Sequence, residues 1–299
     1  MLKISDFKKI KLEDKKIFDK LYKDYPPDHS DYLFTTLISW MDYGNYKFAY
    51  YNDNIILSSK IDKILRLRPP IGKFDIEVFK EVFELAKTID AKYPFGMINN
   101  DTKKFILSYY PKVKFFSHRD FFEYVYFSSD LADLKGSKFS KIRNRLNKFN
   151  RQVKYEIENI SKKNYNEVKT FLKRWCLWKD CEKDPVLKYE KKAVLFSIDN
   201  FYNLGLNGLL IRINDKIEAI SVFERLNFDT AVVHYEKGSP YYDGIYKAIN
   251  KEAANLLKNK FKYINRESDM GIPGLRRAKT SYSPHHMVEV FHIKKDNLP

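Results

Sequence analysis

The stretch Lys135–Lys154, with the sequence KGSKFSKIRNRLNKFNRQVK, lies near the middle of the chain and contains eight Lys or Arg residues but no Asp or Glu. Its apolar residues recur every three or four positions, which places them on one face of a helix. These residues are Phe139, Ile142, Leu146, Phe149 and Val153. A basic stripe beside that face consists of Lys138, Lys141, Arg145 and Lys148. The pattern predicts one amphipathic helix that packs against a core with one side and presents positive charge with the other.

The same order of elements is predicted on both sides of this helix: two helices and three strands, then a helix, a strand, a helix and a strand. In the first half the predicted helices are Glu13–Lys23, Tyr32–Met41, Ile76–Ile89 and Thr102–Tyr109, and the strands are Tyr46–Tyr51, Ile55–Lys60, Ile64–Arg68, Phe95–Ile98, Val113–Ser117 and Phe121–Phe127. In the second half the helices are Tyr165–Lys179, Pro185–Leu204, Asp243–Lys258 and Pro273–Ser281, and the strands are Tyr155–Ile160, Leu209–Ile213, Ile217–Glu224, Thr230–Glu236, Tyr263–Arg266 and Met287–His292.

Short motifs keep the two halves in register. Asn52-Asp53 corresponds to Asn214-Asp215 at an offset of 162 (214 − 52), and Pro70 corresponds to Pro240 at an offset of 170 (240 − 70). Any single pair can arise by chance, but the shared order of elements favours a tandem duplication of an α/β unit of about 150 residues. This order resembles the GNAT N-acyltransferase fold. We therefore expect a first GNAT-like domain at residues 1–127, a basic connecting helix at 128–154, and a second GNAT-like domain at 155–299 that carries the active site.

The composition favours a folded protein with an affinity for polyanions. The chain has 299 residues, of which 44% are hydrophobic, and a formal net charge of +16 from 55 basic and 39 acidic residues. Such an excess favours nucleic acid, an anionic membrane surface or phosphorylated ligands. A coding sequence rich in A and T would also produce a chain rich in Lys, Asn, Ile, Tyr and Phe, so the charge alone leaves both explanations open.

The two cysteines, Cys176 and Cys181, are too few for a disulfide framework and lack the partners of a zinc site. We expect buried thiols in a reducing compartment, and no metal. The first thirty residues do not resemble a signal peptide, and no apolar run approaches the roughly 18–20 residues of a membrane span. The expected location is the cytoplasm, with at most peripheral contact with a membrane.

The stretch Asn265–Pro284, NRESDMGIPGLRRAKTSYSP, combines glycines, basic residues and carboxylates. Pro273 favours the first turn of a helix, and Gly271 and Gly274 relax the chain around it. Arg276 and Lys279 then share a helix face and could hold a carboxylate or phosphate near the helix N-terminus. The alternative is a capped surface helix that follows an ordinary turn.

Two carboxylates and a histidine are candidates for proton transfer. Glu267 and Asp269 follow a predicted central strand, and ligands of α/β sheets usually bind at strand ends. Either carboxylate could orient or deprotonate an attacking amine or hydroxyl; alternatively, Asp269 caps the helix and Glu267 pairs with an arginine. His234 lies on a neighbouring predicted strand, where it would be either a proton shuttle or a satisfied core histidine.

Two motifs together resemble the C-terminal catalytic domain of phosphatidylglycerol lysyltransferases, and in particular its stand-alone soluble members. The first motif is Asp130-Leu131-x-x-Leu134-x-Gly136-x-Lys138-Phe139-x-x-x-Arg143-Asn144-x-x-Asn147-x-Phe149. The second is Arg266-Glu267-x-Asp269-Met270-Gly271-Ile272-Pro273-Gly274-Leu275-Arg276-x-Ala278-Lys279-x-Ser281-Tyr282-x-Pro284. The resemblance covers nearly the whole chain and implies a tandem GNAT fold. Better-known relatives transfer an aminoacyl group from aminoacyl-tRNA to a lipid head group, and Fem-type aminoacyltransferases share the doubled fold.

The chain departs from these relatives in two respects. The membrane-embedded flippase half of the lipid-modifying enzymes is absent from this sequence. The segment Lys237–Gly244 also lacks the Gln/Arg-x-x-Gly-x-Gly/Ala pattern with which acetyltransferases hold the coenzyme A pyrophosphate. These departures favour aminoacyl-tRNA over coenzyme A as the donor, and no bound cofactor.

The resulting hypothesis is an aminoacyltransferase that acts on an amine or hydroxyl acceptor. The expected catalytic residues are Glu267, Asp269 and His234. The expected substrate-binding residues are Arg266, Gly271, Gly274, Arg276, Lys279 and Tyr282. The expected tRNA-binding residues are Lys138, Lys141, Arg143, Arg145 and Lys148. The alternatives are an acyl-coenzyme A N-acyltransferase and a non-enzymatic module that binds RNA or an anionic membrane.

Overall fold

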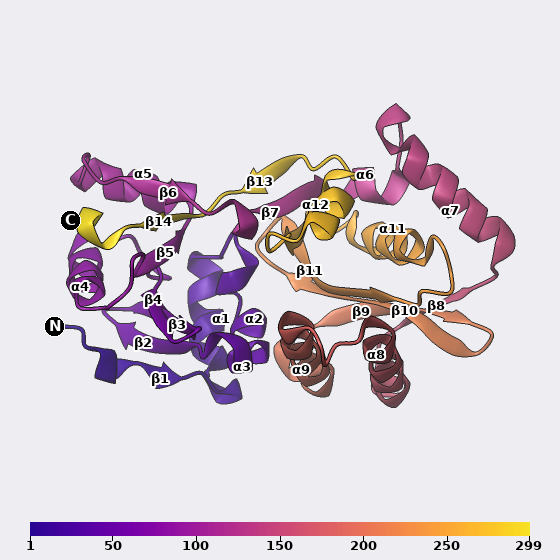
Figure 1. The fold of residues 1–299 in the computed structure, drawn as a ribbon, viewed down its shortest axis with the longest axis horizontal. Helices are drawn as coiled ribbons and strands as arrows, with labels where there is room; N and C mark the ends of the chain where they lie inside the picture. Colours follow the sequence, from indigo (N-terminus) through magenta and orange to yellow (C-terminus); the bar gives the residue numbers. More distant parts are fainter. The chain divides into compact units, whose positions relative to one another are not determined.

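The computed structural model describes residues 1–299 and divides into two units (Figure 1). Unit 1 comprises residues 1–122 and 288–299, and unit 2 comprises residues 123–287. The chain forms two mixed sheets of seven strands, each flanked by helices. The predicted α/β class with two GNAT-like domains is confirmed.

The sheet of unit 1 is antiparallel except where its fourth and fifth strands run parallel. The strands are β1 (Lys8–Lys9), β2 (Lys47–Tyr51), β3 (Asn54–Ile61), β4 (Ile64–Leu67), β5 (Phe95–Ile98), β6 (Phe115–Ser117) and β14 (Phe291–Ile293). The helices are α1 (Lys15–Asp24), α2 (Phe34–Ser39), α3 (Met41–Gly44), α4 (Ile76–Lys87) and α5 (Asn100–Tyr109). Helix α4 begins after Asp75, whose side chain accepts from the Glu77 N–H, and its apolar face packs into the core of the unit.

The sheet of unit 2 has the strand order β13-β7-β12-β11-β10-β9-β8; β11 and β12 pair in parallel, and the pairs β7–β12, β11–β10, β10–β9 and β9–β8 are antiparallel. The strands are β7 (Glu123–Phe127), β8 (Glu156–Asn159), β9 (Asn207–Ile213), β10 (Lys216–Arg225), β11 (Thr230–Gly238), β12 (Tyr263–Ser268) and β13 (His286–Val288). The helices are α6 (Ser128–Asp133), α7 (Ser140–Gln152), α8 (Tyr165–Lys179), α9 (Pro185–Asp199), α10 (Phe201–Leu204), α11 (Ile245–Leu257) and α12 (Pro273–Thr280). Helix α11 covers one face of the sheet, and α8 and α9 cover the other (Figure 1). None of the helices is long and apolar enough to cross a membrane.

The two hairpin turns that suggested a duplication have the same backbone conformation. Asn52 and Asp53 have φ values of 45° and 57°, and Asn214 and Asp215 have φ values of 47° and 61°. Two successive left-handed residues give the type I′ turn that matches the twist of antiparallel strands, and Asn and Asp tolerate this conformation well. The internal repeat is therefore visible in local geometry as well as in the order of elements.

The predicted closing strand Met287–His292 is wrong as a single element. It is two short strands that are separated by Glu289 and Val290: β13 lies at the edge of the second sheet, and β14 inserts between β5 and β6 of unit 1. Strand β7, in turn, belongs to unit 2. The first unit therefore ends at Phe122 and includes residues 288–299, which differs from the expected boundaries at residues 127 and 155. Alternation within one strand does not reveal which sheet it joins.

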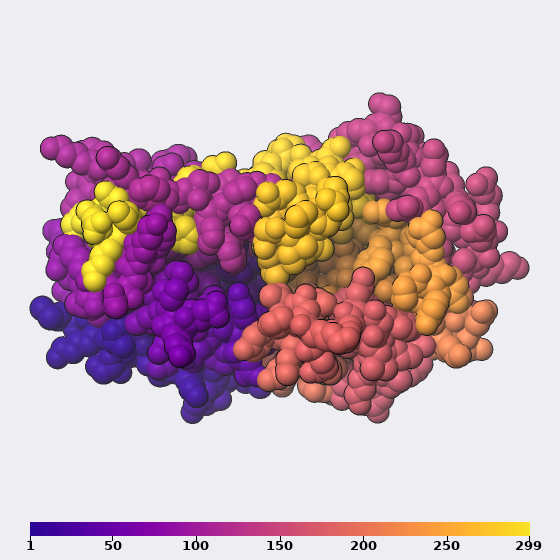
Figure 2. Space-filling model, in the orientation of Figure 1, coloured from indigo at the N-terminus to yellow at the C-terminus, as the bar shows by residue number.

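The basic stretch is helical over a shorter length than predicted. Residues 137–139 form a short 3-10 turn, α7 begins at Ser140, and Leu134 and Gly136 have φ values of 51° and 85°, which prevent one continuous helix. The apolar face is confirmed, because Phe139, Ile142, Leu146 and Phe149 are buried in the core of unit 2. The opposite side of α7 lies on the surface of this unit (Figure 2). The helix is therefore an integral part of unit 2.

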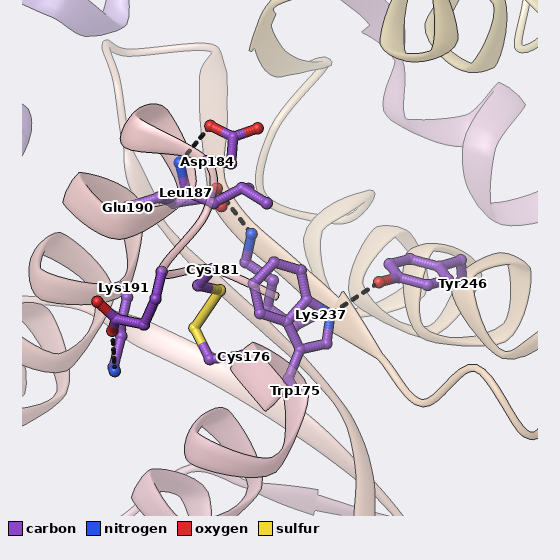
Figure 3. The surroundings of a disulfide bond; sticks show 10 residues. Trp175, Cys176, Cys181, Asp184, Leu187, Glu190, Lys191, Lys237 and Tyr246 are labelled. Carbon is purple, nitrogen blue, oxygen red and sulfur yellow. Dashed lines mark hydrogen bonds and ion pairs between the residues drawn. A yellow bond between two sulfur atoms is a disulfide. The ribbon is translucent and has the colours of Figure 1, made fainter. Parts of the chain in front are cut away.

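The expectation of free thiols is wrong. Cys176 and Cys181 are both buried and form a disulfide bond across the end of α8, with Cα atoms 5.1 Å apart. Figure 3 shows this bond beside Trp175, whose indole N–H donates to the Tyr246 hydroxyl at 3.1 Å. The left-handed Asp180 turns the chain back after α8 and brings the two cysteines together.

Candidate functional site

Strands β11 and β12 run side by side and then separate. They pair in parallel from Thr230 with Tyr263 to Val232 with Asn265. Beyond this point Glu267 adopts a left-handed conformation, with a φ of 59°, and the register of β12 against β7 shifts. Ion pairs then connect the two strands in place of backbone hydrogen bonds. This break in the ladder positions most of the predicted catalytic and substrate-binding residues.

His234 lies between two carboxylates. Its Nδ1 is 2.8 Å from Glu267 Oε1, its Nε2 is 2.8 Å from Glu224 Oε1, and its side chain is 3% exposed. Burial favours the neutral ring, but the two carboxylates outweigh burial and raise the pKa of His234 to about 10. The ring is therefore an imidazolium at neutral pH, and it holds Glu267 in place. This arrangement favours a positioning role over the expected proton shuttle.

Stability is expected to fall at alkaline pH because of this ion triad. The folded pKa of about 10 exceeds the ordinary 6.5, so the stabilisation is complete below pH 6.5 and is lost as the pH rises through 10. The free energy of unfolding should fall by on the order of 5 kcal/mol across this window. Urea unfolding at several pH values measures this decrease in the free energy of unfolding. A His234→Gln variant should show a clearly smaller decrease, and an equal decrease in both proteins would refute the explanation.

Arg266 and Glu236 form a second, buried connection between the strands. Arg266 Nη2 donates to Glu236 Oε2, and its guanidinium lies 4.9 Å from the centre of the Tyr282 ring. Asn250 of α11 donates to the other oxygen of Glu236 at 2.9 Å. Three buried polar atoms beside this pair have no protein partner: Arg266 Nε, Arg266 Nη1 and Asn250 Oδ1. Buried polar atoms are usually paired, so these three atoms are exceptions within the core of unit 2.

Asp269 fixes the turn that follows β12. It is fully buried and accepts from the Tyr124 hydroxyl at 2.5 Å, the Gly271 N–H at 2.9 Å, and two guanidinium nitrogens of Arg276, each at 2.9 Å. Burial alone would raise the pKa of Asp269, but these donors hold it well below its ordinary range. An ionised carboxylate with so many donors is a weak base. The geometry therefore favours a structural role for Asp269 and Arg276.

Lys279 also points inward, towards the end of β12. Its Nζ donates to the backbone carbonyl oxygens of Arg266, Glu267 and Ser268, the last two at 3.0 and 2.6 Å. Burial lowers the pKa of Lys279 to about 8. Gly271 has a φ of 73°, as the predicted turn requires, whereas Gly274 has free space around it and no such constraint. The cations that the sequence suggested for an external anion thus hold the turn itself.

Comparisons with known proteins identify the family of the chain. The family model described as phosphatidylglycerol lysyltransferase, C-terminal, matches residues 22–294. The chain belongs to this family. No curated protein matches it significantly.

Solved structures show the same fold over nearly the whole chain. A conserved protein of unknown function from Bacteroides thetaiotaomicron is 31% identical, with coverage of 96% of this chain and 98% of that one, and a TM-score of 0.88. L-PGS from Bacillus licheniformis is 14% identical, with coverage of 94% and 92% and a TM-score of 0.65. FemX is 9% identical, with coverage of 98% of both chains and a TM-score of 0.57. At the two lower identities the likeness establishes the fold.

The basic residues of the phosphatidylglycerol lysyltransferase motif on and before α7 have internal partners. Lys138 Nζ is 2.7 Å from Asp130 Oδ2, and Arg143 Nη1 donates to the carbonyl oxygens of Leu134 and Gly136. Arg145 pairs with Asp243 at 3.3 Å on the surface. Lys141 and Lys148 are exposed along the same stripe. Lys138 and Arg143 therefore hold the turn between α6 and α7, and the exposed lysines are better placed to contact phosphates.

Two variants of α7, one with a double change and one with a single change, are expected to separate RNA binding from stability. The double change Lys141→Ala with Lys148→Ala should weaken tRNA binding and lower the salt slope of log K by about 1–2, without affecting unfolding. Arg143→Ala should instead destabilise unit 2 by about 2 kcal/mol, because two backbone carbonyls lose a charged donor. Fluorescence anisotropy with tRNA at several salt concentrations, together with urea unfolding, measures both. Lys154→Ala, which lies beyond the helix, serves as the control; equal losses of affinity in all variants would contradict the assignment.

Several residues of the site were absent from the sequence-based prediction. Glu236 contacts Arg266, Glu224 contacts His234, and Tyr124 contacts Asp269. Glu236 lies two residues after His234, but the register between β10 and β11 shifts at His234, so simple alternation along the strand did not predict its contact with Arg266. Glu224 and Tyr124 come from β10 and β7, and their proximity follows only from the order of strands in the sheet.

Proposed function

We propose that the chain is an aminoacyltransferase that moves an aminoacyl group from aminoacyl-tRNA to an amine or hydroxyl acceptor. Membership of the phosphatidylglycerol lysyltransferase family supports the reaction class. The observation that carries the proposal is the position of Glu267, a partly exposed carboxylate fixed by an imidazolium where β11 and β12 separate. In GNAT-like folds the acyl donor lies in such a gap.

Glu267 is the most accessible carboxylate of this cluster. Its side chain is 31% exposed, whereas those of Glu224 and Glu236 are 13% and 11% exposed and that of Asp269 is fully buried. His234 holds Oε1 of Glu267, which leaves Oε2 to accept a hydrogen bond from an incoming acceptor. Glu267 is therefore the residue best placed to orient the acceptor and remove its proton.

The reaction needs no covalent enzyme intermediate, because the ester to the tRNA ribose is already activated. The acceptor nitrogen or oxygen attacks the ester carbonyl carbon, Glu267 takes the acceptor proton, and the C–O bond to the ribose breaks. Glu267, now protonated, gives this proton to the departing ribose oxygen, so that the charges balance and the carboxylate is restored.

The segment after β11 disfavours coenzyme A as the donor. Two of its backbone N–H groups are already bonded, Ser239 to the Glu218 carbonyl at 2.8 Å and Ile245 to the Tyr242 carbonyl at 3.2 Å. Pro240 has no N–H to offer. A pyrophosphate would therefore find few free donors in this segment, which agrees with the absence of the acetyltransferase pattern.

The test is transfer of labelled amino acids from a pool of charged tRNA to fractions of a cell extract that contain lipids, peptides and small molecules. We expect label in one acceptor fraction, with dependence on the intact ester. A parallel reaction with labelled acetyl-coenzyme A should give no product. Absence of transfer from every aminoacyl-tRNA to every fraction would overturn the proposal. Formation of product from acetyl-coenzyme A would show that the donor is an acyl-coenzyme A and not aminoacyl-tRNA.

A further inference from the structure

Unit 1 has a cavity at the position where its own parallel strands separate. Strands β4 and β5 pair only at Leu67 and Phe95. After β4 the chain continues as Pro69-Pro70, and proline has no N–H with which to extend the ladder. A cavity of about 280 Å³ lies between this segment and the start of α5. Its size is near the lower end of small-molecule sites, which span ~300–1,000 Å³.

The two units differ at the point where their parallel strands separate. In unit 2, Glu267 and Arg266 of β12 form ion pairs with β11 across the separation. In unit 1 the residue with the same left-handed conformation as Glu267 is Met97, which has a φ of 59° and lies 170 positions earlier (267 − 97). Methionine cannot act as a base. Unit 1 therefore has no carboxylate at the strand position that Glu267 occupies in unit 2.

The lining of the cavity is aromatic and acidic. The rings of Tyr25, Tyr32 and Phe74 contribute to it, together with the carboxylates of Asp28 and Asp101. None of its lining residues is Lys or Arg, although the chain contains 55 of them. Rings and carboxylates are the features that select an organic ammonium ion. The nearest buried cation, Arg68, lies 5.6 Å from the centre of the Tyr32 ring and donates to the Asp31 carbonyl oxygen.

Asp28 is held in place for this role. Its Oδ2 accepts from the Asn99 amide at 3.0 Å, and its other oxygen has no protein donor. Asn99 Oδ1 accepts from the Thr102 N–H at 2.8 Å and caps α5, so the start of this helix is already satisfied. The Tyr32 hydroxyl donates to the Met97 carbonyl at 2.8 Å, which fixes that ring in the wall. Asp101 is bridged to Lys104 at 3.2 Å on the surface, so Asp28 is the main charge of the site.

We propose that this cavity binds a small organic cation through an alkylammonium group that pairs with Asp28 and packs against the rings of Tyr25, Tyr32 and Phe74. The same group occurs in free amines and in phosphorylated head groups, and the shared chemistry is the ammonium. The site lies within unit 1 and does not depend on transfer at Glu267.

The test is calorimetry or saturation-transfer NMR on the full chain with choline and n-butylamine. The neutral isostere 3,3-dimethyl-1-butanol and the anion butyrate are the matched controls. We expect the cations to bind at least about 10-fold more tightly than either control, since one tenfold step corresponds to about 1.4 kcal/mol. Phosphocholine and phosphoethanolamine distinguish the sources: tighter binding of these compounds indicates a head group, and weaker binding indicates a free amine.

Variants make the site assignment falsifiable. Asp28→Asn keeps the size of the side chain and should reduce cation binding about 10-fold or more, while Asp24→Asn, an exposed residue outside the cavity, should have no effect. Glu267→Gln should bind the cation like the unmodified chain, which separates this proposal from the proposed transferase activity. Equal binding of choline and its neutral isostere, or unchanged binding in Asp28→Asn, would overturn the proposal.

Discussion

Replacing Glu267 by Gln is expected to lower the rate of aminoacyl transfer by about 100-fold or more, because a positioned general base typically contributes 10²–10⁴-fold. Glutamine keeps the size of the side chain, and its carbonyl oxygen can still accept from the His234 ring, which is 2.8 Å from Glu267 in the unmodified chain. The amide cannot take up a proton from the acceptor. Single-turnover transfer from charged tRNA is the measurement.

A matched control keeps this result interpretable. Glu156→Gln changes an exposed carboxylate on β8 in the same unit and should leave the rate unchanged. Both variants should bind tRNA as tightly as the unmodified chain, since neither residue belongs to the basic stripe of α7. A Glu267→Gln enzyme with full activity would remove this residue from the mechanism.

Asp269→Asn is expected to have the largest effect on stability, a loss of about 3–5 kcal/mol in the free energy of unfolding of unit 2. Breaking a buried charge pair leaves the partner charge uncompensated, and such changes typically cost this much. Asp269 is fully buried and accepts four hydrogen bonds, from Tyr124, Gly271 and twice from Arg276. An asparagine side chain turns one of its acceptors into a donor that faces other donors.

Urea unfolding followed by tryptophan fluorescence measures this loss. A Trp40→Phe background leaves Trp175 and Trp178, which both lie on α8, so the signal reports on unit 2. The control is Asp243→Asn, which removes the surface pair with Arg145 and should change stability by no more than about 1 kcal/mol. Similar changes in the two variants would show that the turn after β12 does not depend on Asp269.

Local patterns predicted most elements of the fold. The sequence places a helix at Tyr165–Lys179 and a strand at Phe95–Ile98, and the structure has both with the same bounds. The Asn-Asp hairpin turns were also predictable, because few residue types tolerate two successive left-handed positions. These features depend on neighbours in sequence, which a single sequence displays directly.

The sequence predicted which residues gather at the site, but it predicted the role of only some of them. The motif from Arg266 to Tyr282 contains the residues that surround the end of β12, yet Arg276 and Lys279 turn towards Asp269 and the backbone rather than outward. Helical spacing places both on one face of α12 but does not say what that face meets. The pairing of Cys176 with Cys181 was missed for a similar reason, since it depends on the left-handed turn at Asp180.

Strand β14 has a consequence for how the protein folds during synthesis. The sheet of unit 1 is complete only when β14 lies between β5 and β6, and β14 is translated after the whole of unit 2. While the ribosome is still making residues 123–287, the facing edges of β5 and β6 lack their partner, and exposed strand edges invite association with other chains. The sheet of unit 1 can therefore be completed only after residues 291–293 have been synthesised.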